Sequence, residues 1–323
     1  MKQPLISVIV PVYNSAEYIE KTAECLASQT YKNMEFILVD DGSTDGSAEL
    51  CDTIAKKYNR FSVIHQKNSG VCAARNAGIK AAKGEYIGFC DADDIPHKDL
   101  YETLYGIIEE YGCDIAMVKT AIVFTDGSVS DTGDGSVKVY TDKSELLRLF
   151  LLNKIQSSVC TKLFSAELCR KLKFPAPRKI NEDRYYSFCA LDKCRKAGFK
   201  NTAKYTYCRR EGSSSSQSFS DKYFDIIYFA EKMERYVCEH YPELSEYARA
   251  NTIDSYLRVC QYIVILNGGK EYNKKLDEIR EFIKQQDKSI CKKYLTKSVF
   301  IKYTLLKIGK FPFRIAVKRL AKL

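Results

Sequence analysis

GEYIGFCDADD, the sequence of residues 84–94, joins a short apolar strand directly to a group of carboxylates. The strand is predicted at residues 86–90, and Asp91, Asp93 and Asp94 follow it. Carboxylates two residues apart in such a loop can bind a hard divalent cation that keeps its other positions open for phosphate oxygens. The competing interpretation is an acidic turn that caps the helix expected to begin near His97.

The residues before this stretch alternate short β-branched runs with amphipathic segments, the pattern of βαβ units in a mostly parallel sheet. Strands are predicted at residues 5–10, 36–39 and 62–65, and helices at residues 14–29, 45–58 and 69–82. Beyond it, the pattern predicts a helix at residues 100–111, a strand at residues 115–124 and a turn-rich loop at residues 125–135. Ligands of open α/β sheets bind at the carboxyl ends of the strands, so one crevice is expected to collect residues 11–14, 40–45 and 91–94.

A second acidic pair, Asp40 and Asp41, follows its own predicted strand in the same way. Two acidic clusters at one edge of a sheet repel each other unless a cation or hydrogen-bond donors lie between them. The sequence therefore favours a site for a metal and a nucleotide over two unrelated acidic turns.

Four motifs, in this order, resemble the signature of the family 2 glycosyltransferases of the GT-A fold. They are SVIVPVYN at residues 7–14, VDDGSTD at residues 39–45, ARNAG at residues 74–78, and the stretch at residues 84–94. The strong resemblance covers about the first 120 residues and ends beyond about residue 220. It implies an α/β protein with a Rossmann-like, mostly parallel sheet flanked by helices, followed by a C-terminal helical extension.

The resemblance also implies roles for the donor side of the site. Tyr13 would stack on the nucleotide base, Asp40 would accept a hydrogen bond from a uracil N–H, and Arg75 would donate to the base or the diphosphate. Asp93 is the expected metal ligand, and Asp91 would touch the ribose or the metal. The other expected nucleotide-sugar contacts are Pro11, Asn14, Asp41 and Ala92. The implied donor is a UDP-sugar, and the implied metal is Mn2+ or Mg2+.

On the acceptor side, Asp183 resembles the family's general base, and Glu182 would orient it. A general base contributes roughly 10²- to 10⁴-fold in rate. The competing interpretation is that both acids favour the first turn of a helix predicted at residues 183–196, because carboxylates are stabilised there by the helix dipole. A metal on one side of the sugar and a base on the other imply inversion at the anomeric carbon.

Arg209 and Arg210 precede a serine-rich stretch and would close over the diphosphate, unless they belong to a solvated linker. Polymerising members of the family carry a Gln-x-x-Arg-Trp motif and transmembrane segments. This sequence has no Trp and no apolar stretch of the roughly 20 residues that a membrane span needs. A single-sugar transfer is therefore expected rather than processive synthesis.

Charge and motifs divide the sequence. The net charge is +10, but residues 1–150 hold 15 Lys and Arg against 23 Asp and Glu, and residues 151–323 hold 36 against 18. We predict a glycosyltransferase domain at residues 1–218, with a nucleotide-sugar half (1–120) and an acceptor-side half (121–218). A helical region is predicted at residues 219–323, ending in a basic tail at residues 288–323.

The basic tail contains eleven Lys and Arg and no acid. Gly309 and Pro312 are expected to break it into two helices. In the second helix one face carries Phe313, Ala316, Val317 and Leu320, and the other carries basic residues, as in helices that lie in a membrane interface. Two interpretations remain: this face contacts an anionic membrane, or it packs on the protein.

Thirteen cysteines without a C-x-x-C pair, and an N-terminus without a signal-peptide pattern, indicate the cytoplasm. We expect an enzyme at the inner face of the cytoplasmic membrane that extends a glycan or lipid-linked glycan of a surface polysaccharide. The alternatives are a nucleic-acid-binding protein that uses the basic half and an inactive module that binds a nucleotide sugar. The sequence contains no RRM, KH or zinc-finger pattern, so no nucleic acid is expected as a partner.

Overall fold

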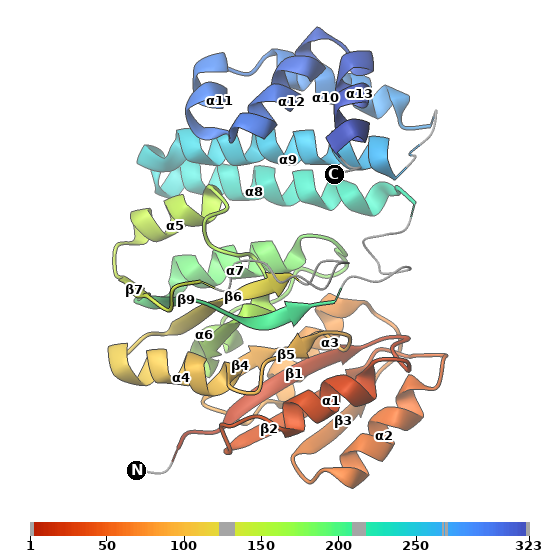
Figure 1. The fold of residues 1–323 in the computed structure, drawn as a ribbon, viewed down its shortest axis with the longest axis vertical. Helices are drawn as coiled ribbons and strands as arrows, with labels where there is room; N and C mark the ends of the chain where they lie inside the picture. Colours follow the sequence, from red (N-terminus) through yellow and green to blue (C-terminus); the bar gives the residue numbers. More distant parts are fainter. Residues whose placement is uncertain (1–2, 123–132, 209–217, 267, 269–270, 321–323) are drawn as a thin grey trace. The chain divides into compact units, whose positions relative to one another are not determined.

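The computed structural model describes residues 3–122, 133–208, 218–266, 268 and 271–320 (Figure 1). The chain divides into two compact units. The first unit contains Met1–Leu147 and Gln156–Cys208, and the second contains Arg148–Ile155 and Arg209–Leu323.

The first unit is built on one sheet with the strand order β3-β2-β1-β4-β8-β6-β9-β5, and β7 pairs with β9. The strands are β1 (Ile6–Val12), β2 (Met34–Asp40), β3 (Phe61–His65), β4 (Tyr86–Phe89), β5 (Ile95–Pro96), β6 (Ile115–Ile122), β7 (Val137–Tyr140), β8 (Lys162–Ser165) and β9 (Ala197–Tyr207). The strands from β3 to β4 are parallel to one another, whereas β8 is antiparallel to both of its neighbours. The predicted α/β fold is therefore confirmed, with a parallel half formed by the first four strands and a mixed half beyond β4.

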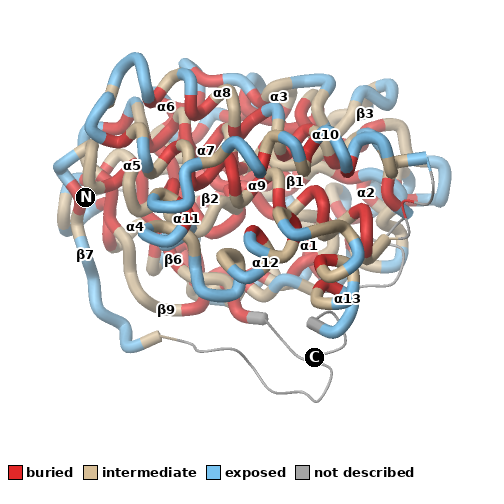
Figure 2. Tube along the Cα trace, turned by 90° about the horizontal axis from the view of Figure 1, so that it is seen from above, coloured by how far each residue is buried: buried red, intermediate tan, exposed pale blue. Residues whose placement is uncertain are grey.

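Helices pack against this sheet. They are α1 (Ile19–Ala27), α2 (Ser47–Lys57), α3 (Val71–Ala81), α4 (Leu100–Tyr111) and α6 (Ala166–Arg170). The chain also forms α7 (Glu182–Lys193), which contacts α6, and α5 (Lys143–Leu151), whose residues are divided between the two units. The helix α3 packs on β1 and β2, and α4 packs on β6 and β9. The side chains of Ile6, Val8, Ile9 and Val10 in β1 are fully buried, and Figure 2 marks such positions in red along the chain. Hydrophobic burial along this central strand is what holds the layers together.

A glycine brings α3 unusually close to the sheet. A Cβ atom at Gly78 would lie 2.3 Å from Cγ2 of Ile9 in β1, a distance that no real side chain tolerates. Because Ile9 is β-branched and buried in the central strand, it has little freedom to move aside. Gly78 therefore sets the distance between α3 and β1, and with it the place of every other residue on α3.

Most predicted elements agree with the structure to within two or three residues, but the helix predicted at residues 14–29 begins only at Ile19. The strand predicted at residues 5–10 extends to Val12, so Pro11 and Val12 still pair with β2. The helix predicted at residues 183–196 is α7. Most of the turn-rich loop predicted at residues 125–135 lies outside the described residues.

The second unit is helical over its described residues (Figure 1). Its α-helices beyond α5 are α8 (Asp225–His240), α9 (Ser245–Ile265), α10 (Asn273–Lys284), α11 (Lys288–Tyr294), α12 (Lys297–Ile308) and α13 (Lys310–Leu320). The helix α9 packs along α8 and also contacts each of α10, α11, α12 and α13. None of the described helices has the length and apolar composition required to cross a membrane.

The helix α13 packs against the protein through the face that was predicted to meet lipid. Phe313 is 0% exposed and Val317 is 1% exposed, and α13 contacts both α9 and α12. Lys310 pairs with Asp277 at 2.6 Å, and Arg314 donates to Asn273 Oδ1 at 2.7 Å, and both contacts tie α13 to α10. The predicted break at Gly309 is confirmed. Pro312 instead lies in the first turn of α13, where a missing N–H leaves no helical bond unmade.

Candidate active site

Asp40 ends β2 as a buried carboxylate with bonding partners for both oxygens. Its Oδ1 accepts a hydrogen bond from the Ser43 amide at 3.0 Å, and its Oδ2 lies 3.0 Å from Nδ1 of His65. Burial alone would raise the pKa of Asp40, but the hydrogen bonds from Ser43 and His65 outweigh it and lower that pKa. The same carboxylate, together with Asp52, raises the pKa of His65. Asp40 is therefore held ionised at the carboxyl end of its strand.

Asp41 points to the loop that leads into α3. Its Oδ1 accepts hydrogen bonds from the Gln66 side chain at 2.7 Å and the Ser69 amide at 2.8 Å, and its Oδ2 accepts one from the Gly70 amide at 2.7 Å. The side chain is buried, so these bonds replace water. Asp41 fixes the start of α3, and its predicted contact with the nucleotide stays a prediction.

The loops after β1 and β2 are joined by Asn14. This residue has a φ of 47°, and its Oδ1 accepts a hydrogen bond from the Thr44 amide at 2.9 Å. The backbone N–H of Asn14 donates a hydrogen bond to Ser43 Oγ at 3.1 Å. Tyr13, immediately before it, is 49% exposed, whereas Pro11 lies within the strand. The end of β1 thus presents an accessible aromatic ring from a fixed loop.

Arg75 on α3 joins two acidic motifs. It is 4% exposed; its Nη2 lies 3.0 Å from Oδ1 of Asp91, and its Nη1 lies 2.9 Å from Oε1 of Glu182. Its guanidinium also lies 5.2 Å from the centre of the Phe174 ring, and its Nε is buried without a partner among the described residues. Burial would lower the pKa of Arg75, but Asp91 and Glu182 raise it, so the side chain stays charged.

Residues 91–94, which follow β4 and Cys90, divide into inward and outward side chains. The Asp94 carboxylate is 1% exposed and accepts hydrogen bonds from the Tyr205 hydroxyl at 2.8 Å and the Cys208 amide at 3.0 Å. Burial, with the charge of Asp91, raises the pKa of Asp94 to about 7. Ala92 is also buried, and its carbonyl accepts from Thr22 Oγ1 at 3.0 Å. Asp91 and Asp93 remain partly exposed, so these two carboxylates can reach a ligand.

Glu182 and Asp183 begin α7, after Asn181 with a φ of 68°. Glu182 is buried; burial and the neighbouring Asp183 raise its pKa, and Arg75 opposes that rise. Asp183 is partly exposed, and its Oδ1 accepts a hydrogen bond from the Arg184 amide at 2.6 Å. The pair therefore separates into one carboxylate held by Arg75 and one at the surface of the site.

A buried lysine beside this pair was not predicted from the sequence. Lys162, at the start of β8, is 1% exposed, and its ammonium donates to the carbonyls of Gln156 and Ser158, each at 2.6 Å. Burial lowers the pKa of Lys162 to about 7, while Asp183 acts in the opposite direction. Its place inside the apolar run VCTKLF is the one signal that could have identified it.

Residues 7–172 match the family described as Glycosyl transferase family 2. The chain belongs to that family. The resemblance seen in the four motifs is therefore confirmed, and the protein is a glycosyltransferase.

Two relatives of this family 2 glycosyltransferase illustrate the similarity. Glycosyltransferase GlyG of Streptococcus pneumoniae serotype 4 is 36% identical over 235 residues, which cover 67% of this chain and 74% of GlyG. The minor teichoic acid biosynthesis protein GgaB of Bacillus subtilis is 28% identical over 317 residues, which cover 94% of this chain. GgaB is the longer protein, and the chain spans 35% of its length.

Among solved structures, S. aureus TarS 1–349 in complex with UDP-GlcNAc superimposes with a TM-score of 0.73. The two are 21% identical, and the match covers 98% of this chain and 91% of that one. The similarity confirms the GT-A fold of the family 2 glycosyltransferase.

The carboxylates after β4 of the glycosyltransferase fit a hard divalent cation that also binds a substrate. The described residues bring no three His, Cys, Asp or Glu side chains together as a complete metal cage. Asp91 and Asp93 alone offer carboxylate oxygens in the loop after β4, and Mg2+ is commonly held by one or two carboxylates with substrate phosphates and water. These residues therefore fit an ion whose remaining ligands come from a diphosphate.

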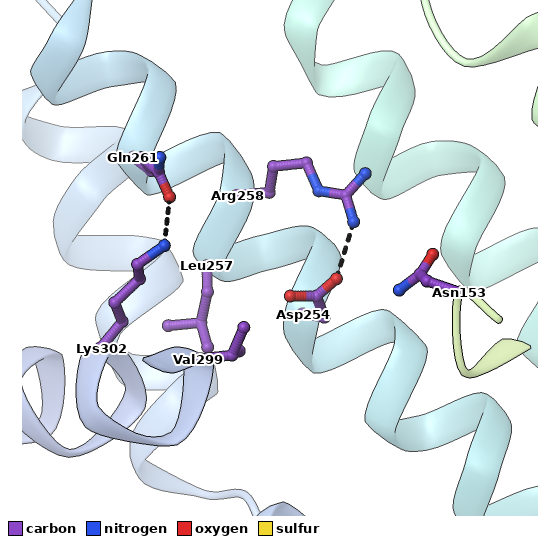
Figure 3. A pocket seen from close by; sticks show the side chains of 7 residues that line it. All are labelled: Asn153, Asp254, Leu257, Arg258, Gln261, Val299 and Lys302. Carbon is purple, nitrogen blue, oxygen red and sulfur yellow. Dashed lines mark hydrogen bonds and ion pairs between the residues drawn. The ribbon is translucent and has the colours of Figure 1, made fainter. Parts of the chain in front are cut away.

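Arg209 and Arg210 are outside the described residues, so their predicted contact with the diphosphate stays a prediction. A cavity of about 430 Å³ lies within the second unit and contains none of the predicted site residues. In it Arg258 is paired with Asp254 at 2.7 Å, and Lys302 donates to Gln261 at 2.7 Å (Figure 3). The charged groups that line the cavity are thus bonded to each other or to a neighbouring amide.

Proposed function

We propose that this glycosyltransferase moves one sugar from a UDP-sugar to a hydroxyl of a glycan or lipid-linked glycan, with inversion and with Mn2+ or Mg2+. The observation that carries the proposal is the position of Arg75 between Asp91 and Glu182. The buried guanidinium of Arg75 thereby connects the loop expected to bind the donor with the helix expected to supply the base. Donor and acceptor chemistry need this proximity, because a bound geometry replaces a bimolecular encounter.

The donor site is assigned to residues 1–120. The ionised Asp40 is suited to accept a hydrogen bond from a uracil N–H, because each carboxylate oxygen can accept more than one bond. Tyr13 is exposed enough to stack on the base. TarS, which shares the fold, is described in complex with UDP-GlcNAc, and this supports a UDP-sugar as the donor.

Asp91 and Asp93 are the residues we assign to the metal. When bound, the ion would neutralise charge that develops on the departing diphosphate. Asp94 is excluded from this role, because its carboxylate is already bonded to Tyr205 and Cys208 in the interior. Arg75 holds one oxygen of Asp91 and so orients that carboxylate.

The base is assigned to Asp183. The proton of the attacking hydroxyl passes to its carboxylate, and the hydroxyl oxygen forms the new bond to the anomeric carbon as the diphosphate departs. Glu182 is paired with Arg75, so we assign it to orienting the start of α7 rather than to proton transfer. Attack from the side opposite the diphosphate gives inversion.

Acceptor binding is assigned to residues 121–218. The helical region at residues 219–323 follows this half. The similarity to GgaB supports an acceptor from surface polysaccharide or teichoic acid synthesis. Sugar nucleotides are cytoplasmic metabolites, so we place the enzyme in the cytoplasm.

A nucleotide-release assay with a panel of sugar nucleotides tests the proposal, with and without a lipid-diphosphate-sugar acceptor and in the presence of Mn2+ or Mg2+. Removal of the metal by a chelator, Asp93→Asn and Asp183→Asn should each abolish transfer. Glu49→Gln, an exposed change on α2, is the matched control and should leave the rate unchanged. Transfer that persists without metal and in both variants would refute the assignment.

A further inference from the structure

Apolar side chains are exposed where α12 passes into α13. Phe311 is 75% exposed, Ile308 is 68% exposed and Ile315 is 40% exposed. Ile315 lies one turn after Phe311, so both lie on one side of α13. On α12, Ile301 is 46% exposed and lies seven residues before Ile308, on the same face of that helix. We call Ile308, Phe311 and Ile315 the apolar corner.

This corner is distinct from the face that the sequence pattern selected. Phe313 and Val317 are buried against the helical unit, so the side of α13 that carries the apolar corner is turned away from that contact. Large exposed apolar side chains are unremarkable singly, but a group of them on one edge marks a surface that binds something.

Basic residues surround the corner. Lys307 and Lys310 flank Ile308, and Lys318 and Arg319 lie three and four residues after Ile315, one turn further along the same side. Lys318 and Arg319 are exposed. Lys310 is paired with Asp277 and Arg314 with Asn273, so part of this charge is used inside the protein. No Asp or Glu occurs from residue 288 to the C-terminus, so the tail itself offers no counter-charge.

We propose that the apolar corner inserts into the headgroup region of an anionic bilayer, with Lys318 and Arg319 on the lipid phosphates. The chemistry is that of an interfacial helix, in which apolar side chains enter the boundary of the acyl chains and basic side chains remain among the headgroups. A bilayer fits better than a protein partner, because a row of basic residues with no acid suits a uniformly negative surface. The proposal does not rest on the donor or acceptor assigned above.

Co-sedimentation of the full chain with vesicles tests it. Vesicles of phosphatidylcholine mixed with phosphatidylglycerol should bind the protein, vesicles of phosphatidylcholine alone should bind it weakly, and high salt should release it. The triple variant Ile308→Ser, Phe311→Ser, Ile315→Ser should lose about tenfold or more in binding, since both an apolar and a basic contribution are needed. Lys318→Gln with Arg319→Gln should lose the preference for anionic vesicles.

Val137→Ser, the same kind of change at an exposed apolar residue of β7, is the matched control and should bind as the parent chain does. Transfer to a water-soluble acceptor and the thermal unfolding temperature should be unchanged in the triple variant, because its side chains lie outside the core. The proposal is overturned if the triple variant binds anionic vesicles as well as the parent chain. It is also overturned if gel filtration shows that the corner joins two copies of the chain. If the parent chain binds anionic vesicles but has no transferase activity, the proposed transferase function is refuted and the proposed membrane-binding surface is not.

Discussion

Arg75 and Glu182 are 107 residues apart in the sequence and form a buried ion pair with a distance of 2.9 Å between Nη1 and Oε1. The same guanidinium holds Asp91, so α3, the loop after β4 and the start of α7 meet at one side chain. This junction combines parts of the chain that the motifs identify separately.

The Arg75 junction should dominate the stability of the site. Arg75→Met should lower the free energy of unfolding by about 3–5 kcal/mol, because it leaves a buried carboxylate without its partner. Adding Glu182→Gln should recover at least ~1 kcal/mol of that loss, because the unpaired charge is then removed. Urea unfolding of the single and double variants measures both effects.

The matched control for this cycle is Arg195→Met, which removes a solvent-exposed arginine paired with Asp114. Its effect should stay within about 1 kcal/mol. If the double variant is no more stable than Arg75→Met, the two residues do not act as a pair.

Lys162 should make stability depend on pH above neutrality. Its pKa is lowered to about 7 in the folded protein, from 10.5 in the unfolded chain. Between these values the unfolded state binds more protons than the folded state, so this group makes folding more favourable as the pH rises. Below about pH 7 the lysine is charged in both states, and its contribution no longer changes.

Lys162→Met removes this dependence. The stability of the parent chain relative to Lys162→Met should therefore increase from about pH 7 to about pH 10, with a slope that approaches ~1.4 kcal/mol per pH unit. Lys171→Met, at the exposed lysine that directly follows α6, should give a constant difference over the same range. A constant difference for Lys162→Met as well would show that Lys162 is not desolvated.

Asp41 should act through the start of α3. Asp41→Asn replaces an acceptor of two backbone amides by a group with only one acceptor oxygen, so it should cost about 1–3 kcal/mol of stability. Because α3 carries Arg75, the KM for the sugar nucleotide should rise together with this loss. Thermal unfolding and steady-state kinetics test the two effects, with Glu49→Gln as the control. A raised KM without any loss of stability would instead indicate direct contact with the nucleotide.

Tyr13, unlike Asp41, should affect the KM for the donor without affecting stability. It is half exposed, so Tyr13→Ala should change stability by no more than about 0.5 kcal/mol. If the ring stacks on the base, the KM for the donor should rise by about tenfold, since stacking of a base on an aromatic ring is worth about 1–3 kcal/mol. Tyr13→Phe keeps the ring and should retain the parent KM. A phenylalanine variant as impaired as the alanine variant would assign the effect to the hydroxyl group.

The parallel strands explain why much of the site could be predicted from the sequence. Strands β1, β2 and β4 end at one edge, so Tyr13, Asp40 and Asp91 had to lie near each other once the strands were recognised. The sequence could not predict which carboxylates turn inward. Asp40 and Asp41 are adjacent, yet Asp40 bonds to Ser43 and His65, whereas Asp41 bonds to the amides before α3. Asp94 is buried, whereas Asp93 beside it stays partly exposed. That choice depends on the path of each loop, which the residue types alone do not determine.

The tail illustrates a different limit. Phe311 with Ile315 and Phe313 with Val317 are both apolar pairs four residues apart on the same helix. Helical periodicity shows that each pair shares a face, but the partner elements decide which face is covered. Here α9 and α12 cover Phe313 and Val317. Lys162 was missed for a related reason, because a lysine in a strand is expected to reach solvent.

The missing side chain of Gly78 has a consequence for redesign of this enzyme. Loops that end on exposed side chains, such as the one that carries Tyr13, can accept many residues while donor preference is altered. Position 78 accepts essentially one, because a single added carbon would collide with Ile9 and displace the helix that holds Arg75. Libraries intended to change the sugar should therefore vary the loops and leave this helix and its neighbouring strand fixed.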